Sequence, residues 1–366
     1  MTTIYLIRHA EAEGNLYRIV QGQRDSTLTD RGWRQVRALE TRFEGVPIDA
    51  VYSSDLYRAR ATATAISRPR GLSVRGVPDL REIRVGEWEE LTFGEIAYRD
   101  PVMLENFGRH MDLWHVPGAE SPREALDRAW KFLNRVAAEH DGQTIAVVSH
   151  GYILRLLLSK IEGMTLEQTG SVPHGDNTAV SLLEYDNGAF RLLFRDDNRH
   201  LQTEAYLQQE TSGKRKNALE TGLRFRELPP DDPLSAELGA EAFDSVGRPF
   251  RRERYVSDAE TRTTLAAYLG ERTAGLAQIG PEPGQISILY LRDAYRRKGM
   301  GVQLIGQAVI RARARGGTHV RTAAPPERAP FFRACGFAPI GPAENGYTLW
   351  EKDIRFPKLD AGPDHD

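Results

Sequence analysis

Three short segments of the sequence combine residue types that suit the chemistry of phosphate esters. Arg8 and His9 follow directly after an apolar run, and His150 follows a second apolar run much later in the chain. Arg58 lies just after a third run. A neutral imidazole can attack phosphorus, and guanidinium groups can neutralise the phosphate oxygens in the transition state. A lone histidine at a strand end is more often structural, so the hypothesis requires a fold that brings these residues together.

The segments around these residues alternate between strand and helix patterns. Apolar runs typical of buried strands occur at residues 3–7, 49–54 and 144–151. Helical patterns with N-terminal caps or apolar periodicity occur at residues 28–43, 55–66, 121–140 and 152–161. This alternation predicts an α/β fold with a mostly parallel sheet covered by helices on both faces. Because the carboxyl ends of parallel strands share one edge, we expect Arg8, His9, Arg58 and His150 to converge there.

Hydrolysis of a phosphate ester also requires a proton for the departing alcohol. The segment DLREIRVGEWEE at residues 79–90 supplies four candidate acids, namely Glu82, Glu87, Glu89 and Glu90. The residue types alone do not choose among these four glutamates. A solvated acidic face is the simpler interpretation for the last three of them.

The segment IRHAEAEGN at residues 7–15 resembles the Arg-His-Gly/Ala-Glu signature of the histidine phosphatase superfamily. That superfamily includes cofactor-dependent phosphoglycerate mutases and broad-specificity phosphatases. SSDLYRARATA, LREIRVGEWE and VVSHGYILR resemble its later motifs, in the same order, so that the resemblance covers residues 1–205. It implies that His9 is the phosphorylated nucleophile and Glu82 the proton donor, and that no metal is required. The phosphate pocket that it implies comprises Arg8, Arg58 and His150, and its implied substrate contacts are Asn15, Gln21, Gly22, Gly151 and Asn177.

The choice between phosphatase and mutase depends on the segment that follows these acids. The mutases that this half resembles carry a longer insertion with paired arginines around the substrate carboxylate. Residues 91–120 contain only the isolated Arg99 and Arg109. This favours a phosphatase that hydrolyses a small phosphate monoester, with a phosphoglycerate mutase as the alternative. The other histidines of the first half lack a comparable context and are expected on the surface or in loops, with His174 as the strongest candidate for an exception; they are His110, His115, His140, His174 and His200.

The second half of the chain has a different order of elements. Strands are expected at residues 223–228, 264–270, 273–280, 284–291, 319–324 and 346–353, and helices at residues 235–243, 301–316 and 329–335. A run of strands flanked by helices predicts an α+β domain with a mainly antiparallel sheet. The domain boundaries that follow are residues 1–208, a polar linker at 209–222, residues 223–356, and a polar tail at 357–366.

A basic, glycine-containing loop precedes the long helix of this second half. Such a loop directs backbone amides, cationic side chains and the positive end of a helix toward one place, which suits a pyrophosphate. The sequence RRKGMG at 296–301 resembles the Arg/Gln-x-x-Gly-x-Gly/Ala signature of the GNAT acyltransferase superfamily, and APFFRACGF resembles a later motif. The resemblance covers residues 223–353 and implies acetyl-CoA as the cofactor and an amine, of unknown identity, as the acceptor. The implied cofactor-binding residues are Leu291, Arg296, Arg297, Lys298, Gly299, Met300 and Gly301.

One departure from the GNAT pattern affects the chemistry. Phe332 stands where the family usually has a tyrosine that protonates the leaving thiolate, and phenylalanine has no proton to give. Asp293, Tyr290 and Tyr347 are possible substitutes, whereas Cys335 is expected to be a small buried residue. Two functions therefore remain open for this half: N-acyl transfer, or a non-catalytic role as an acyl-CoA-sensing or interaction module.

The composition limits the other classes of function. The chain has 366 residues, a net charge of −2, 40% hydrophobic residues and a single cysteine. The length indicates two domains, and the charge gives no general attraction to nucleic acid or anionic membrane. One cysteine excludes an internal disulfide framework and a cysteine-rich zinc site. Because no signal peptide or membrane-spanning run is evident, we expect a cytoplasmic protein of undetermined oligomeric state.

Overall fold

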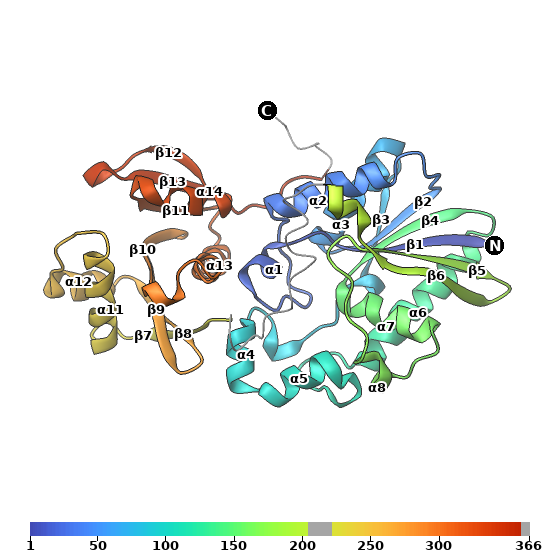
Figure 1. Ribbon diagram of the computed structural model, residues 1–366, viewed down its shortest axis with the longest axis horizontal. Helices are drawn as coiled ribbons and strands as arrows, with labels where there is room; N and C mark the ends of the chain where they lie inside the picture. Colours follow the sequence, from blue (N-terminus) through green and yellow to red (C-terminus); the bar gives the residue numbers. More distant parts are fainter. Residues whose placement is uncertain (204–221, 360–366) are drawn as a thin grey trace.

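The computed structural model describes residues 1–203 and 222–359 (Figure 1). Most of the expected linker at 209–222 and of the expected tail at 357–366 lies outside the described residues. The chain forms two β-sheets, of six and seven strands, which lie side by side and are each covered by helices.

The first sheet has the strand order β3-β2-β4-β1-β5-β6. Its strands are β1 (Thr2–Arg8), β2 (Ala50–Ser54), β3 (Val74–Val77), β4 (Thr144–Ser149), β5 (Val180–Asp186) and β6 (Ala189–Asp197). β1 to β4 are parallel to one another, whereas β5 and β6 are antiparallel. The mostly parallel sheet expected from the sequence is confirmed, although the two antiparallel strands β5 and β6 on one side of it were not anticipated.

The helices of this half are α1 (Glu13–Tyr17), α2 (Asp30–Arg42), α3 (Tyr57–Ser67), α4 (Phe93–Arg99), α5 (Pro101–Arg109), α6 (Pro122–Glu139), α7 (Gly151–Ile161) and α8 (Leu166–Thr169). The predicted caps form: Thr29 accepts a hydrogen bond at the start of α2, and Ser121 closes a capping box at the start of α6. The predicted start of α3 at Asp55 is wrong, because the Asp55 carboxylate binds Arg81 instead of capping the helix.

Successive side chains of the central strand β1 point to opposite faces of the sheet, and each face has its own hydrophobic cluster. Ile4 and Leu6 of β1 pack in one cluster with residues of α6 and α7, whereas Ile7 packs with residues of α2 and α3. Side chains on a strand point to opposite faces in turn, so β1 is apolar on both faces. The strand is therefore fixed in register, and its last residue, Arg8, is held at the carboxyl edge of the sheet.

The second sheet has the order β12-β13-β11-β10-β9-β8-β7 and is mainly antiparallel, as expected. Its strands are β7 (Arg224–Leu228), β8 (Thr263–Leu269), β9 (Arg272–Ile279), β10 (Gln285–Leu291), β11 (His319–Ala324), β12 (Ala338–Pro342) and β13 (Thr348–Asp353). Its helices are α11 (Pro233–Asp244), α12 (Arg252–Ala259), α13 (Gly301–Ala314) and α14 (Ala329–Ala334). α12 was not predicted, because only Tyr255 and Ala259 of its residues are buried and its apolar pattern is correspondingly weak.

The two parallel strands of this sheet separate soon after they begin. Gln285 and Ile286 of β10 pair with Arg321 and Thr322 of β11, and the two strands share no further paired residues. A β-bulge follows in β10 at Ser287, where the pairing with β9 shifts by one residue. Bulges bend a strand and raise its local twist, so β10 diverges from β11 at this point. An opening through the sheet results.

The two halves meet where α1 packs against α13 (Figure 1). Tyr17 of α1 is 2% exposed and belongs to the same hydrophobic cluster as Ile305 and Ala308 of α13. A Cβ atom on Gly306 of α13 would lie 2.6 Å from the Tyr17 side chain, so this glycine permits the close approach. Part of the first half thus completes the core of the second.

A buried ion pair accompanies this apolar contact. Glu13 at the start of α1 is 2% exposed, and its carboxylate lies 2.7 Å from Arg313 and 3.7 Å from Lys352. The chain also returns from β13 to the first half, where the Phe356 ring packs against Tyr57 with centroids 5.3 Å apart. Both contacts join residues that are far apart in the sequence.

Replacing Tyr17 tests how far the two halves depend on each other. Tyr17→Ala should destabilise the protein by about 3–5 kcal/mol, because it empties a filled position in a shared core. Tyr98→Ala is the matched control: Tyr98 also contacts the other half, through Arg224, but is 46% exposed. Its loss should cost about 1 kcal/mol or less. Urea unfolding measures both, and equal effects would contradict the interpretation of Tyr17 as a shared core residue.

Candidate active sites

The carboxyl edge of the first sheet brings together the residues expected to converge there. Arg8 is the last residue of β1 and lies opposite Ser149 of the adjacent parallel strand β4. His9 directly follows β1, and His150 directly follows β4. The centroids of their two rings lie 5.1 Å apart. Arg58 lies in the first turn of α3, directly after β2. Parallel pairing therefore places both histidines and both arginines around one spot.

Hydrogen bonds fix the orientation of His9. Its Nδ1 lies 2.7 Å from the carbonyl oxygen of Ala10, so a proton on Nδ1 is donated to that oxygen and Nε2 keeps its lone pair. Asn177 Nδ2 donates to the His9 carbonyl at 2.8 Å, and Thr62 Oγ1 accepts from the amide of Ala10 at 2.8 Å. These contacts hold both the backbone and the ring of His9, whose side chain is almost completely buried.

The cationic and imidazole groups around His9 are also buried. Arg58 is 1% exposed and donates to the carbonyl oxygens of Gly22 and Arg24, each at 2.8 Å. Its Nε atom and both ring nitrogens of His150 have no hydrogen-bond partner among the described residues. Buried polar groups normally find partners, so these groups are candidates to bind an anion. Arg8 approaches closely because residue 151 is glycine: a Cβ there would lie 3.1 Å from Arg8 Nε.

Burial sets the protonation of the two histidines. It lowers the pKa of His9 well below its ordinary value of 6.5, and the charges of Arg58 and Arg8 lower this pKa further. The pKa of His150 is lowered in the same way, first by burial and then by Arg58. Both rings are therefore neutral near pH 7, which is the state in which an imidazole nitrogen can act as a nucleophile.

Among the four glutamates of residues 79–90, Glu82 lies at this site. Its carboxylate accepts from the amides of Ile83 at 3.0 Å and Tyr152 at 3.2 Å, the latter in the first turn of α7. Burial raises the pKa of Glu82 above its ordinary value, despite the opposing hydrogen bonds. Glu89 instead lies 3.4 Å from Arg24 in an ion pair, and Glu87 and Glu90 are exposed.

Several of the residues expected to contact substrate form structural hydrogen bonds near the site. Asn15 Oδ1 accepts from the amide of Ala12, Gln21 Oε1 accepts from the hydroxyl of Ser26, and the Gly22 carbonyl holds Arg58. Direct contact of Asn15, Gln21, Gly22, Gly151 and Asn177 with a substrate stays a prediction. Thr62 was missed, although its spacing of four residues from Arg58 on one helix places both on one face.

The other histidines divide into structural and exposed groups. His200 bonds to Arg42 and Thr178, and His140 bonds to Tyr52 and Gln143, so both have structural partners. His110 and His115 are exposed. His174 is the exception that the sequence left open: it lies beside Gly151 at the edge of the site.

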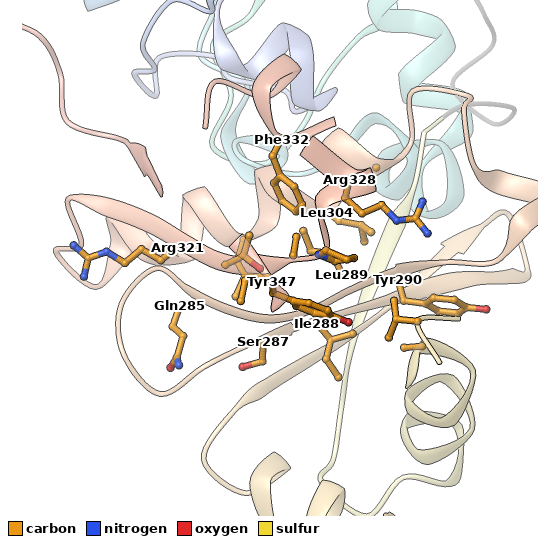
Figure 2. A pocket seen from close by; sticks show the side chains of 18 of the residues that line it. Gln285, Ser287, Ile288, Leu289, Tyr290, Leu304, Arg321, Arg328, Phe332 and Tyr347 are labelled. Atoms are coloured by element: carbon orange, nitrogen blue, oxygen red, sulfur yellow. The ribbon is translucent and has the colours of Figure 1, made fainter. Parts of the chain in front are cut away.

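The second half contains a cavity of about 1760 Å³ where β10 and β11 separate. Its lining includes Leu289, Leu304, Phe332 and Tyr347 as well as residues of the basic loop at 296–301. In Figure 2, Phe332 and Ser287 lie on opposite sides of the labelled group that contains Leu289 and Tyr347. The cavity is therefore lined by residues from both faces of the sheet.

The loop at 296–301 has the geometry of an anion cradle. Arg297 and Gly299 have positive φ angles of 56° and 75°, and α13 begins at Gly301. A Cβ on Gly299 would meet nothing within 4 Å, so this side of the loop is open. Arg296 braces the loop, because it donates to the Leu291 carbonyl and pairs with Asp293. Arg297 and Lys298 are exposed and form no ion pair within the described residues, whereas the Met300 side chain is buried.

The candidate acids and bases of this cavity differ in availability. Asp293 is paired with Arg296, and Tyr290 donates its hydroxyl proton to Glu241. Burial raises the pKa of Cys335 to about 12, which argues against a nucleophilic thiolate. The Tyr347 hydroxyl is buried at the cavity wall and has no hydrogen-bond partner among the described residues. Of the proposed substitutes for Phe332, Tyr347 is thus the least committed to another contact.

Two further properties concern the described residues as a whole. None of their histidines, cysteines, aspartates and glutamates forms a group of three or more that could hold a metal ion. None of the helices within 1–203 and 222–359 has the length and apolar character needed to cross a membrane.

Known proteins resemble each half of the chain separately. Residues 4–198 match the histidine phosphatase superfamily (branch 1), and residues 232–349 match the acetyltransferase (GNAT) domain. A metal-independent phosphoserine phosphatase of Arabidopsis thaliana is 32% identical over 220 residues, which span 59% of this chain and 90% of that protein. An adenosylcobalamin/alpha-ribazole phosphatase of Escherichia coli (strain K12) is 32% identical over 167 residues, or 45% of this chain and 81% of that protein.

A solved structure shows the same fold for the first half. Bacillus stearothermophilus YhfR superimposes with a TM-score of 0.53 at 32% sequence identity, covering 55% of this chain and 99% of that chain. The superposition leaves the second sheet outside the shared region, which agrees with a chain built from two families. This protein belongs to the histidine phosphatase superfamily, branch 1, and carries a GNAT acetyltransferase domain after its phosphatase domain.

Proposed function

We propose that the first half is a metal-independent phosphatase that hydrolyses a small phosphate monoester through phosphorylated His9. The observation that carries this proposal is the orientation of His9: its Nδ1 is bound to the Ala10 carbonyl, so Nε2 is the free nucleophile among buried cations. Arg8, Arg58 and His150 would surround the three equatorial oxygens of the phosphoryl group.

Two displacements account for the reaction. In the first, His9 Nε2 forms a bond to phosphorus while the bond from phosphorus to the alcohol oxygen breaks, and Glu82 gives its proton to that oxygen. In the second, water attacks the phosphoryl group, Glu82 takes a proton from the water, and the bond from phosphorus to His9 breaks. The raised pKa of Glu82 favours the protonated carboxyl that the first displacement requires.

The two arginines of residues 91–120, Arg99 and Arg109, favour hydrolysis over the mutase reaction. Arg99 pairs with Glu95 and Arg109 with Glu105, each within one helix, and both arginine side chains are mostly exposed. A clamp for a substrate carboxylate would require the two arginines to lie side by side. Each of them is instead bound to a glutamate of its own helix. The relatives named above as phosphatases support the same choice, although the chain also matches proteins named as phosphoglycerate mutases, such as mutase-like protein 4 of Arabidopsis thaliana.

Removing the nucleophile tests this mechanism. His9→Ala should lower kcat/KM for phosphate-monoester hydrolysis by about a thousandfold or more, because no other group can carry the phosphoryl. Activity of the unmodified protein should persist in excess EDTA. His115→Ala is the matched control, since His115 is exposed and has no part in the proposed mechanism. Full activity of His9→Ala would overturn the mechanism, and phosphoglycerate interconversion that requires priming by a bisphosphate would establish the mutase alternative.

The opposite pKa shifts of His9 and Glu82 predict the pH profile. Activity toward an alkyl phosphate should fall as pH rises through the raised pKa of Glu82, because the proton for the leaving alcohol is then lost. It should fall on the acid side only well below pH 6.5, where His9 gains a proton. An aryl phosphate whose leaving group needs no proton should lack the alkaline fall, as should Glu82→Gln. If the fall in activity at alkaline pH persists unchanged in Glu82→Gln, the proton donor is another residue.

We infer that the second half binds acetyl-CoA and transfers its acetyl group to an amine. Three features fit the pyrophosphate of CoA and the extended remainder of that molecule. They are the open loop around Gly299, the cations Arg297 and Lys298, which form no ion pair within the described residues, and the adjoining split between β10 and β11. Acetyl-CoA, when bound, supplies an activated thioester: the amine nitrogen bonds to the carbonyl carbon, the carbon–sulfur bond breaks, and the proton lost by nitrogen ends on sulfur. Tyr347 is the candidate to deliver that proton.

A second function is favoured by one observation. Phe332, at the usual position of the acid, is 5% exposed and stacks on Trp350, so it is a core residue of α14. A domain without an acid could bind acyl-CoA and report its presence without turnover. Binding of acetyl-CoA with no transfer to any amine tested would favour this sensing function over transfer.

A matched pair of glycine substitutions tests the cofactor site. Gly299→Ala and Gly270→Ala impose the same backbone strain, since φ is 75° and 59° and neither Cβ would meet an atom within 4 Å. Each should therefore cost about 1 kcal/mol of stability. Only Gly299→Ala adds a methyl group to the proposed pyrophosphate cradle, so it alone should weaken acetyl-CoA binding, about tenfold, in calorimetry. Equal affinity in the two variants, or no binding by the unmodified protein, would reject the assignment.

A further inference from the structure

The cavity of the second half connects the two faces of its sheet. Ile288 and Tyr290 of β10 pack in a cluster with Leu238 of α11, whereas Leu289 and Leu304 pack in the cluster of α13. Residues of both clusters line the same cavity. A ligand that enters from the α13 face and one that enters from the α11 and α12 face can therefore meet at the split between β10 and β11.

The proposed acetyl-CoA site occupies one of these faces. The loop at 296–301 and the start of α13 lie at the carboxyl end of β10, and the split runs from there toward Ser287. The wall formed by the connection between α11 and α12 remains for the acceptor. The inference that follows rests on the proposed acetyl transfer, and it concerns the chemistry of that remaining wall.

Three arginines dominate this wall. Arg248, Arg251 and Arg254 line the cavity from the end of α11 to the first turn of α12, and their side chains are exposed. None of them forms an ion pair within residues 1–203 and 222–359. Arg248 has only an aromatic partner, with its guanidinium 5.4 Å from the centre of the Phe243 ring. Three like charges that face one space repel each other unless an anion lies between them.

The carboxylates of the cavity do not balance these charges. Asp258 pairs with Arg262 at 3.2 Å, and Asp293 pairs with Arg296 at 2.6 Å. Glu282 is the remaining acidic residue in the described lining, and it lies on the loop between β9 and β10. A cationic acceptor such as a polyamine would need several free carboxylates at this wall. The charge pattern instead fits a negatively charged group.

We propose that the acceptor is an amine that also carries an anionic group, a carboxylate or a phosphate, which binds to Arg248, Arg251 and Arg254. Guanidinium groups match the planar oxygens of a carboxylate and the oxygens of a phosphate with paired hydrogen bonds. Anchoring the anionic end leaves the amino group to reach the split between the strands. If the anion is a phosphate, the acetylated product is itself a phosphate monoester, the bond class that the first half is proposed to hydrolyse.

Calorimetry on the His9→Ala protein saturated with CoA tests this assignment without requiring turnover. The probes are four amines of similar length: β-alanine, O-phosphoethanolamine, ethanolamine and 1,3-diaminopropane. β-Alanine or O-phosphoethanolamine should bind at least about tenfold more tightly than ethanolamine, because each adds charge-assisted hydrogen bonds. The preferred one of the two identifies the anion as carboxylate or phosphate, and diaminopropane should bind most weakly.

Two neighbouring arginines provide the variant and its control. Arg254→Ala should weaken binding of the anionic amine about tenfold, and Arg254→Glu should abolish the preference for it. Arg252→Ala should leave affinity unchanged, because Arg252 lies on the same turn of α12 but does not line the cavity. This comparison also separates the cavity from the phosphatase site, which both variants leave intact.

Three results would overturn the proposal: tightest binding of diaminopropane, equal binding of ethanolamine and the anionic amines, or equal effects of Arg252→Ala and Arg254→Ala. Absence of binding by all four probes would also overturn it. A failure of the proposed transfer is distinguishable, because it appears as failure of CoA to bind in the first titration or as amine binding without thiol release from acetyl-CoA.

Discussion

The ion pair between Glu13 and Arg313 connects the two halves of the chain through α1 and α13. A carboxylate that is 2% exposed requires a cation, and its nearest cations, Arg313 and Lys352, both belong to the second half. Glu13 lies four residues after His9, the proposed nucleophile, and is the first residue of α1. Arg313 lies at the other end of the helix that begins at the proposed pyrophosphate loop. One helix of the second half thus supports the segment that follows His9.

A single physical effect sets opposite protonation states within the phosphatase site. Removal from water disfavours the charged form of every titratable group. It lowers the pKa of His9 and His150, which favours their neutral rings, and raises the pKa of Glu82, which favours its protonated carboxyl. The same buried environment therefore shifts the proposed nucleophile and the proposed proton donor toward the states that phosphoryl transfer needs.

The sequence predicts what depends on local pattern and on the geometry of parallel strands. The apolar runs before His9 and His150 indicate buried strands, and pairing of β1 with β4 then brings the two rings together. Glu82 could not be chosen over Glu89 from residue types, because the difference lies in the distant partners Tyr152 and Arg24. The arginines of the cavity wall, in α12 and in the connection that precedes it, were missed for a related reason. A helix with two buried residues has little periodicity, and its role depends on a cavity assembled by strands that follow it in the chain.

The two sites use arginine in different ways. Arg58 is buried, and two backbone carbonyls fix its guanidinium, so its position is set before a phosphate arrives. Such preorganisation suits stabilisation of a transition state, which tolerates little displacement of charge. Arg248, Arg251 and Arg254 are exposed and lack carboxylate partners in the described chain, so their long side chains keep conformational freedom until an anion orders them. That freedom lowers affinity but lets the same wall accept oxygen groups of different shape. A buried cation therefore indicates where chemistry is fixed, and a cluster of unpaired exposed cations indicates where a ligand is selected by charge.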